Sequence, residues 1–372
     1  MSGPPLRVVV CGTGFGRFYV RALRGMPDTF RLSGLLTRGG EYSRRYAEEL
    51  GVPLYTGPDQ LPDDIDAACV VVGSAVSGGA GGELARSLLE RGLHVIQEHP
   101  VHHDELAEAL RLARRNRAIY HLNPFYRHVE PVRRFLAAAG ALRRSGPFLF
   151  IDATSAIQVL HPLLDILARA LGGPRPWALS HPLQADPEVT ALAAHAQPYR
   201  VLQATVAGVP LTLRVQNQLD PSDGDNHALL WHRLALGTAD GVLTLADTHG
   251  PVLWHPRLYA PRDEHGRLLT TGPGTEHLDQ PATSLLAGTA APTHREVFDL
   301  LWPRALERAL TGFAADVRAG TDPMARGQFD LGVCRLWHDT TARLGRPEII
   351  RPDPPRPPTA DELGRTALEE IP

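Results

Sequence analysis

Hydrophobic and polar positions divide the chain into two stretches of different character. Up to about residue 123, short apolar runs alternate with amphipathic helical stretches, and Asp66–Gly73 is a run without alternation. Such runs are typical of strands buried on both faces of a parallel sheet. From Phe148 onward, strand-like runs are separated by turn signals such as Asp223-Gly224, which favours antiparallel strands. We therefore predict an α/β chain: an N-terminal doubly wound parallel sheet and a C-terminal α+β domain with an open, mostly antiparallel sheet.

The expected domain boundaries follow this change of pattern. We predict a first domain over residues 1–123, a second over 124–350, and an extended, peripheral, proline-rich tail over 351–372. Long helices are expected from Thr293 to Arg318 and from Ala325 to Leu344. The expected strands of the second domain are 148–153, 200–207, 210–217, 231–237, 241–246 and 252–254.

A glycine-rich turn, Cys-Gly-Thr-Gly-Phe-Gly-Arg, joins the first apolar run, Leu6–Val10, to a helix expected over Phe18–Gly25. Strand, glycine turn and helix in this order begin a dinucleotide-binding (Rossmann) fold, because the turn brings bare backbone N–H groups to a pyrophosphate at a helix N-terminus. The usual Gly-x-Gly-x-x-Gly would need glycine where Arg17 stands, so an ordinary tight turn is the alternative. We predict that a nicotinamide nucleotide binds at Gly12, Thr13, Gly14, Phe15 and Gly16.

Basic and hydroxyl side chains follow the second expected strand, Arg31–Thr37, where a chain that binds NAD usually has Asp or Glu for the ribose. A guanidinium matches a 2′-phosphate, and a nearby hydroxyl can share the contact. We therefore predict NADP(H) as the cofactor, bound through Arg38, Ser43 and Arg44. The alternative is that Arg44 belongs to the solvated face of a helix.

Two further cofactor contacts are expected where parallel strands end, because this edge of the sheet faces the cofactor. Ser74 begins a glycine-rich loop that runs to Gly82, and Glu98 follows the strand expected over His94–Gln97. His99, His102 and His103 could share a helix face only if the next helix began before Asp104. No cysteine or carboxylate completes a ligand set there, so we predict no metal site.

Composition excludes several classes of function. The net charge is −3, so the chain lacks the basic footprint of a nucleic-acid-binding protein. No stretch reaches the roughly 20 apolar residues of a membrane span, and the chain enters a strand without a signal peptide. Cys11, Cys69 and Cys334 lie far apart, which favours buried, reduced thiols. We expect a cytoplasmic protein with no nucleic-acid or membrane partner.

Two segments resemble the glucose–fructose oxidoreductase/inositol dehydrogenase family. Gln97-Glu98-His99-Pro100 is similar to the family's Glu-Lys-Pro segment, with His99 in place of the lysine beside substrate and nicotinamide. His161, in the segment His161–Leu171, aligns with the family's catalytic histidine, but the acidic residue four positions earlier is Ile157 here. The resemblance implies a substrate contact for His161.

The chain, with these replacements, resembles one branch of the family, the thiazolinyl imine reductases of siderophore and nonribosomal peptide biosynthesis. The branch resemblance implies NADPH-dependent reduction of a thiazoline C=N to a thiazolidine on a substrate tethered to a peptidyl carrier protein. The wider family suggests a homodimer. The segments that carry the branch resemblance are Cys11-Gly12-Thr13 with Phe15-Gly16, Gly51–Thr56, Ile96–Pro100, and Asn123 with Phe125-Tyr126.

Reduction of an imine needs a hydride on carbon and a proton on nitrogen. An imidazole can carry a proton at neutral pH, and a phenol stays protonated there. We therefore predict His99 and Tyr126 as catalytic proton donors. Their structural alternatives are a hydrogen-bonded histidine at a turn and a core aromatic side chain.

Two other functions remain open from the sequence. An NADP-dependent sugar or cyclitol dehydrogenase would normally need the lysine and the acidic residue, and both are replaced here. A nucleotide-binding regulator that has lost the chemistry would tolerate the same replacements.

Overall fold

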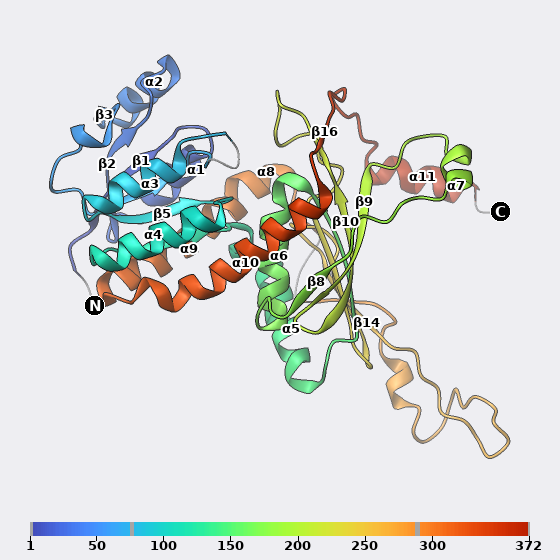
Figure 1. Ribbon diagram of the computed structural model, residues 1–372. Coiled ribbons are helices and arrows are strands. Elements are labelled where there is room, and N and C mark those ends of the chain that lie inside the picture. The colour runs from blue at the N-terminus through green and yellow to red at the C-terminus, as the bar shows by residue number, and fades with distance from the viewer. Residues whose placement is uncertain (1–2, 75–77, 287–290, 371–372) are drawn as a thin grey trace.

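The computed structural model describes residues 3–74, 78–286 and 291–370, which form two large sheets side by side (Figure 1). Residues 75–77 of the loop expected over Ser74–Gly82 lie outside the described residues. The first sheet has six parallel strands in the order β3-β2-β1-β4-β5-β6. Its strands are β1 Leu6–Cys11, β2 Phe30–Leu36, β3 Leu54–Tyr55, β4 Ala67–Val70, β5 His94–Glu98 and β6 Tyr120–Asn123.

Alternate residues of the central strands enter two separate cores, one on each face of this sheet. Val8 and Val10 of β1 pack with Tyr19 of α1 (Gly16–Arg24). Val9 packs with Leu88 of α3 (Gly81–Glu90), in the core that α4 (His103–Arg115) completes. Helix α2 (Glu41–Leu50) joins the α1 side. The predicted doubly wound parallel sheet is therefore confirmed, and strands apolar on both faces are its cause.

The second sheet has eight strands in the order β15-β14-β13-β12-β7-β10-β9-β8, and it is mostly antiparallel, as predicted. Only β7 and β10 pair in parallel among its described strands. The strands are β7 Phe150–Ala156, β8 Trp177–Leu179, β9 Tyr199–Val206, β10 Val209–Gln216, β12 His232–Gly237, β13 Gly241–Leu245, β14 Val252–Pro256 and β15 Ser284–Leu285. A small parallel pair, β11 (Gln218–Leu219) and β16 (Glu348–Ile349), lies apart.

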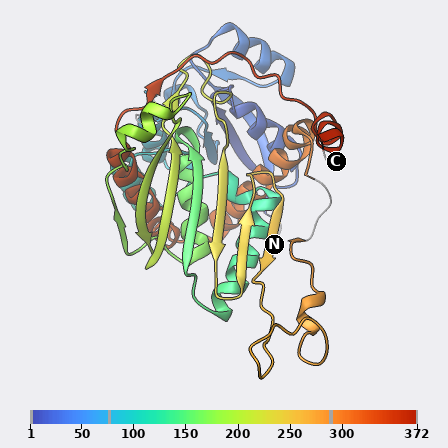
Figure 2. The same cartoon turned by 90° about the vertical axis from the view of Figure 1, so that its right-hand side faces the viewer.

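In the part of the chain that the structure describes, helices cover only one face of the second sheet. Leu213 and Leu234 point inward and are buried with residues of α5 (Glu130–Ser145) and α6 (Leu160–Leu171). The residues at the alternate positions of the same strands, such as Thr212 and Arg233, are exposed on the other face. Figure 2 shows this uncovered outer face toward the viewer.

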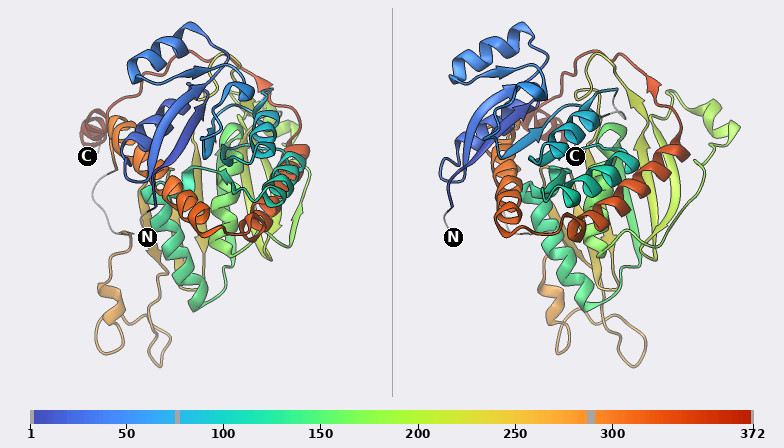
Figure 3. Two further views of the ribbon diagram at one scale, coloured as in Figure 1. Left: turned by 90° about the vertical axis from the view of Figure 1, so that its left-hand side faces the viewer. Right: turned by 60° about the vertical axis from the view of Figure 1, so that its left-hand side comes forward.

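The C-terminal helices return to the first sheet. A short α8 (His294–Glu296) and a π-helical turn, η6 (Val297–Leu301), lead into α9 (Trp302–Ala319), which packs on α1. Helix α10 (Pro323–Leu344) packs on both α4 and α6, so it ties the two halves together (Figure 3). No helix of the described ranges is both long and apolar enough to cross a membrane.

Two expectations were wrong in detail. The tail is exposed over 351–365, but it contains helix α11 (Ala360–Glu370), which we did not predict. Its signal was present, since Thr359 and Glu362 form reciprocal hydrogen bonds of a capping box. Helix α4 begins at His103 with His102 as N-cap, one residue before the expected start at Asp104. Helix α7 (Pro187–Leu192) and the 3₁₀ turns η1 (Pro58–Gln60), η3 (Tyr126–His128), η4 (Ile157–Val159) and η5 (Glu276–Asp279) were also not predicted.

A long connection between β14 and β15, residues 257–283, projects beyond the strand ends (Figures 1 and 2). We call it the arm. It is held by its own hydrogen bonds, including that from the Leu269 N–H to the Pro261 carbonyl at 2.8 Å. Leu258 and Tyr259 are 86% and 60% exposed. The arm therefore presents apolar side chains that its own fold does not cover.

Candidate active site

The glycine turn after β1 meets the spatial demands of a dinucleotide site despite its irregular spacing. Gly12 has φ +92°, and a Cβ there would lie 2.6 Å from the Val71 carbonyl oxygen. A Cβ at Gly14 would meet open space, which leaves room for a ligand. At Gly16 a Cβ would lie 3.2 Å from Val10 Cγ1. Because α1 begins at Gly16, this residue provides the close approach of helix to strand that the third glycine usually allows.

The other predicted groups of the nucleotide site gather beside this turn. No side chain caps the first turn of α1 at Phe15, so its N–H groups remain open to an anion. The Thr13 and Ser43 hydroxyl oxygens are 2.8 Å apart, which joins the turn to α2. Arg38 follows β2 and Arg44 lies in the first turn of α2, and both are exposed. The residues present therefore fit a dinucleotide with an anionic group near α2.

Ser74, which was predicted to contact the cofactor, makes a hydrogen bond within the protein. Its buried hydroxyl donates to the Pro100 carbonyl oxygen at 2.7 Å, which joins the end of β4 to the turn after β5. A contact of Ser74 with the cofactor stays a prediction.

A cavity of about 880 Å³ opens between the glycine turn, the ends of β5 and β6, and the start of α9. Aromatic side chains form most of its apolar lining, and the Trp302 ring centroid lies 5.6 Å from that of Phe15 and 6.0 Å from that of Trp231. Its aromatic residues are Phe15, Phe18, Phe125, Tyr126, Trp231, Phe298 and Trp302, and its polar residues include Arg17, Arg21, Glu98, His99, Gln158, Asp225, Asn226 and Asp299.

His99 lines this cavity, and its orientation is defined by acceptors. Its Nδ1 lies 2.8 Å from Glu98 Oε1 and 3.2 Å from the Asn123 carbonyl oxygen. Because both partners only accept hydrogen bonds, Nδ1 carries the proton in the neutral ring. Nε2 is then an acceptor in neutral His99 and a donor in its protonated form.

Glu98 is held by protein groups on its other oxygen as well. Its Oε2 accepts a hydrogen bond from the Tyr19 hydroxyl and one at 3.4 Å from the Asn123 amide. Burial and the Glu98 charge raise the pKa of Tyr19 well above its ordinary value, so this phenol remains a donor. The Asn123 Oδ1 accepts from the Phe125 N–H at 3.1 Å, and Phe125 has φ +54°. Asn123 thus fixes the strained turn that carries Tyr126.

Tyr126 lies beside His99, with ring centroids 6.0 Å apart in an edge-on arrangement. Burial raises the pKa of Tyr126 well above its ordinary value, and the charges of Asp225 and Glu98 act in the same direction. The hydroxyl therefore stays protonated on the wall of the cavity. The two predicted proton donors are thus neighbours.

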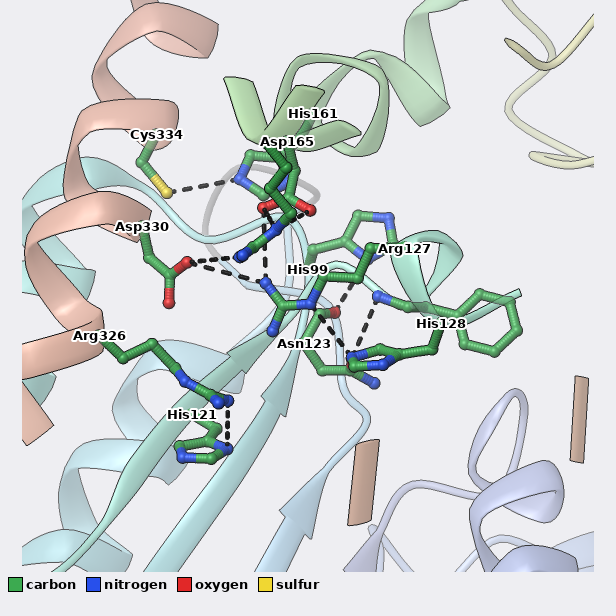
Figure 4. A network of polar contacts seen from close by, with 12 residues as sticks. His99, His121, Asn123, Arg127, His128, His161, Asp165, Arg326, Asp330 and Cys334 are labelled. Atoms are coloured by element: carbon green, nitrogen blue, oxygen red, sulfur yellow. Dashed lines mark hydrogen bonds and ion pairs between the residues drawn. The ribbon is translucent and has the colours of Figure 1, made fainter. Parts of the chain in front are cut away.

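His161 lies behind His99 and does not line the cavity (Figure 4). The two imidazole rings stack at 5.8 Å, and His161 Nε2 is 3.5 Å from Cys334 Sγ. Burial lowers the pKa of His161 to about 3, so the ring is neutral. Its buried Nδ1 has no hydrogen-bond partner in the described part of the chain. Its predicted substrate contact stays a prediction.

A sealed charge network behind the site was not predicted from the sequence. Arg127 Nη1 lies 3.4 Å from Asp165 Oδ1 and 3.9 Å from Asp330 Oδ1, and Figure 4 shows these groups converging from three elements. Arg169 Nε is 3.0 Å from both Asp165 oxygens. Only the Asp165–Arg169 spacing of four residues in one helix could have been noticed beforehand.

Burial and neighbouring charges act in opposite directions in this network. Burial alone would raise the pKa of Asp165, but Arg169 and Arg127 hold it below its ordinary value. For Asp330, burial prevails and raises the pKa to about 6. Burial also lowers the pKa of Arg127 to about 10 and that of the adjacent His128 to about 2. The neighbouring arginines therefore outweigh burial at Asp165 but not at Asp330.

His102 and His103 lie at the start of α4, which begins at His103. The His102 side chain accepts a hydrogen bond from the Asp104 N–H, as an N-cap. Within the residues that the structure describes, no group of three or more His, Cys, Asp or Glu side chains is placed to hold a metal ion.

Comparison with known families assigns the two halves separately. Residues 6–123 match the profile of an oxidoreductase family with an NAD-binding Rossmann fold, GFO_IDH_MocA. Residues 147–255 match the profile of the C-terminal domain of Irp3-like thiazolinyl imine reductases. No curated protein sequence matches the chain.

Solved structures share the fold at low sequence identity. KijD10, a 3-ketoreductase from Actinomadura kijaniata in complex with NADP, is 18% identical with a TM-score of 0.64, and the match covers 93% of this chain and 100% of that one. UDP-N-acetylglucosamine 3-dehydrogenase GnnA from Acidithiobacillus ferrooxidans is 15% identical with a TM-score of 0.59, covering 92% and 98%. Myo-inositol 2-dehydrogenase from Lactobacillus plantarum gives the same identity, TM-score and coverage as GnnA.

Proposed function

The chain belongs to the Gfo/Idh/MocA oxidoreductase family and carries an Irp3-like C-terminal domain, and from this premise we propose that it is an NADPH-dependent thiazolinyl imine reductase. The proposed reaction reduces a thiazoline C=N to a thiazolidine on an intermediate tethered to a peptidyl carrier protein in siderophore or nonribosomal peptide biosynthesis. The observation that carries the proposal is the pairing of an Irp3-like domain with His99 and Tyr126 on one cavity.

The proton for the imine nitrogen comes from this pair of residues. Protonated His99 donates from Nε2, because its Nδ1–H is committed to Glu98 and Asn123. Tyr126 is the second donor, since its phenol is protonated at neutral pH. The aromatic side chains of the cavity offer apolar surface to the substrate. When bound, the nicotinamide cofactor supplies the hydride.

We propose NADP(H) rather than NAD(H), on the exposed guanidinium groups of Arg38 and Arg44 beside the Thr13–Ser43 contact. Replacing both arginines with alanine should raise the Kd for NADPH by about tenfold or more and leave that for NADH within about twofold. Titration of protein fluorescence measures both constants. Equal weakening of the two cofactors would contradict the assignment.

We also propose that the chain forms a homodimer through the outer face of the eight-stranded sheet. That face lacks a helical layer (Figure 2), and Phe150 and Leu285 on it are 40% and 56% exposed. The arm leans to the same side (Figure 1). Sedimentation velocity should show a dimer, and replacing residues 258–282 with a short glycine–serine turn should raise its dissociation constant. A monomeric wild type would contradict this assembly.

The first test is oxidation of NADPH with a hydroxyphenyl-thiazoline thioester, beside NADH and a panel of sugars and cyclitols. Consumption with the thiazoline and a thiazolidine product by mass spectrometry would support the imine reductase. Turnover of a polyol with NADP⁺ would move the protein to the sugar and cyclitol dehydrogenases. Tight binding of NADPH without turnover of any substrate would favour a nucleotide-binding regulator and contradict the proposal.

A further inference from the structure

The cavity has a buried floor and an exposed mouth. At the floor, His99 and Glu98 side chains are 10% and 12% exposed, and Tyr126 is also buried. At the mouth, Arg21 and Asp299 side chains are each 53% exposed, and Phe298 is 45% exposed. The mouth therefore lies between α1 and the π-helical turn η6. A tethered substrate can enter through this opening.

Helix α1 presents a basic surface at this mouth. Its exposed side chains are Arg17, Arg21 and Arg24, and the helix contains no acidic residue. A shallow groove of about 590 Å³ continues from the mouth along α1, and Arg21 lines both the groove and the cavity. Arg24 and Tyr46 lie farther along the groove. We call Arg17, Arg21, Arg24 and this groove the α1 surface.

Neighbouring carboxylates neutralise this surface only in part. Arg21 Nη1 lies 3.3 Å from Asp299 Oδ1, and Glu49 lines the groove. Among the described residues, no carboxylate forms an ion pair with Arg17 or Arg24. Phe298 adds exposed apolar area across the mouth, at 45% exposure. The surface thus combines unneutralised guanidinium groups with apolar side chains.

We propose that the α1 surface docks an acidic peptidyl carrier domain, with Arg21 and Arg24 receiving the phosphodiester and acidic side chains at the base of its substrate arm. This rests on the proposed imine reductase, whose substrate is tethered. Guanidinium groups match phosphate oxygens bidentately, and complementary charge at the rim of an interface steers association and fixes its register. The carrier then presents its thioester to the mouth, and the carrier's own substrate arm reaches the floor at His99.

Arg24→Glu tests the proposal, because Arg24 lies on the α1 surface but not on the cavity wall. Two substrates are compared: a hydroxyphenyl-thiazoline thioester loaded on a carrier domain of net negative charge, and the same acyl group as a small free thioester. We expect kcat/KM for the loaded carrier to fall about fivefold to tenfold through KM, while the free thioester is unaffected. Added salt should lower the wild-type rate with the carrier more than the variant rate.

Arg144→Glu is the matched control, since Arg144 is an exposed arginine in the last turn of α5, away from the mouth. It should leave both substrates unaffected. If Arg24→Glu leaves the loaded carrier unaffected, or slows both substrates equally, the docking proposal is wrong while the proposed reaction stands. If the wild type turns over neither substrate, the proposed reaction is wrong and the docking proposal fails with it.

Discussion

Two polar clusters lie on opposite sides of the turn that follows β6, and they differ in their relation to solvent. Glu98 and His99 line the cavity, and the buried Asn123 amide donates a hydrogen bond to Glu98; the three residues come from the ends of neighbouring parallel strands. Arg127, on the same turn, joins Asp165 and Asp330 in a cluster that is sealed between η3, α6 and α10. Similar residue types are thus placed in an open and a closed environment a few residues apart.

The two environments suit different roles: the open cluster can act in the reaction, and the sealed cluster can stabilise the fold. A carboxylate beside the cavity can orient a histidine toward a bound ligand, because the ring lines the cavity. A sealed carboxylate has only its fixed partners, so its charge must be compensated by the fold itself. We therefore expect substitutions in the open cluster to change turnover and substitutions in the sealed cluster to change stability.

The largest effect is expected from Arg127→Met. The substitution removes the buried cation beside Asp165 and Asp330, which should lower the free energy of unfolding by about 3–5 kcal/mol. Urea unfolding followed by circular dichroism measures the loss. Arg326→Met is the control, because the Arg326 side chain is 40% exposed and an exposed pair contributes about 1 kcal/mol or less. Equal losses for the two variants would contradict the sealed character of the network.

Asp330→Asn should change how stability depends on pH. Burial raises the pKa of Asp330 from 3.8 to about 6, so the folded chain holds this proton more tightly than the unfolded chain. Its contribution to stability is therefore present at low pH and is lost as pH rises through that window. The variant lacks this loss. Between roughly pH 4 and 7, its free energy of unfolding should therefore rise by about 3 kcal/mol relative to that of the wild type. Parallel stability curves for the two proteins would show that Asp330 is not perturbed.

Glu98→Gln should act on turnover. The amide oxygen can still accept the His99 Nδ1–H, but the negative charge beside the ring is lost. We expect kcat to fall about 10- to 100-fold, with an unfolding free energy within about 1 kcal/mol of the wild type. The Kd for NADPH decides between two roles. A higher Kd with unchanged kcat would assign Glu98 to cofactor binding, as the sequence suggested.

The smallest effect is expected from Cys334→Ala, at the junction of the two clusters. The thiol lies 3.5 Å from His161 Nε2, and burial raises its pKa, so it remains neutral. Loss of this weak contact and the small cavity left behind should cost about 1 kcal/mol of stability. Turnover should not change. A raised KM would instead show that His161 contacts the substrate and that Cys334 orients it.

Much of the fold could be predicted because its signals are local. The uninterrupted apolar run of β4 can be recognised from a few neighbouring residues, and so can the glycines of the first turn. The tail helix α11 also had a local signal in the Thr359–Glu362 capping box, which the proline-rich composition around it obscured.

The candidate site likewise has residues that could be predicted from local signals and residues that could not. His99 and Tyr126 could be proposed from the sequence because each follows the end of a predicted strand, where a parallel sheet presents its ligands. Their partners could not be proposed in this way. Tyr19 reaches Glu98 across 79 positions, and Asp330 and Cys334 come from a helix near the end of the chain.

The sequence by itself therefore determined the element types, the parallel and antiparallel halves and the residues at the strand ends, because period, glycine turns and caps act between near neighbours. Tertiary structure alone decided that α10 spans both halves, that His161 stands behind His99, and that the mouth of the cavity lies beside the arginines of α1. These features depend on which surfaces are buried together. Burial is a property of the whole packed chain, and no local pattern encodes it.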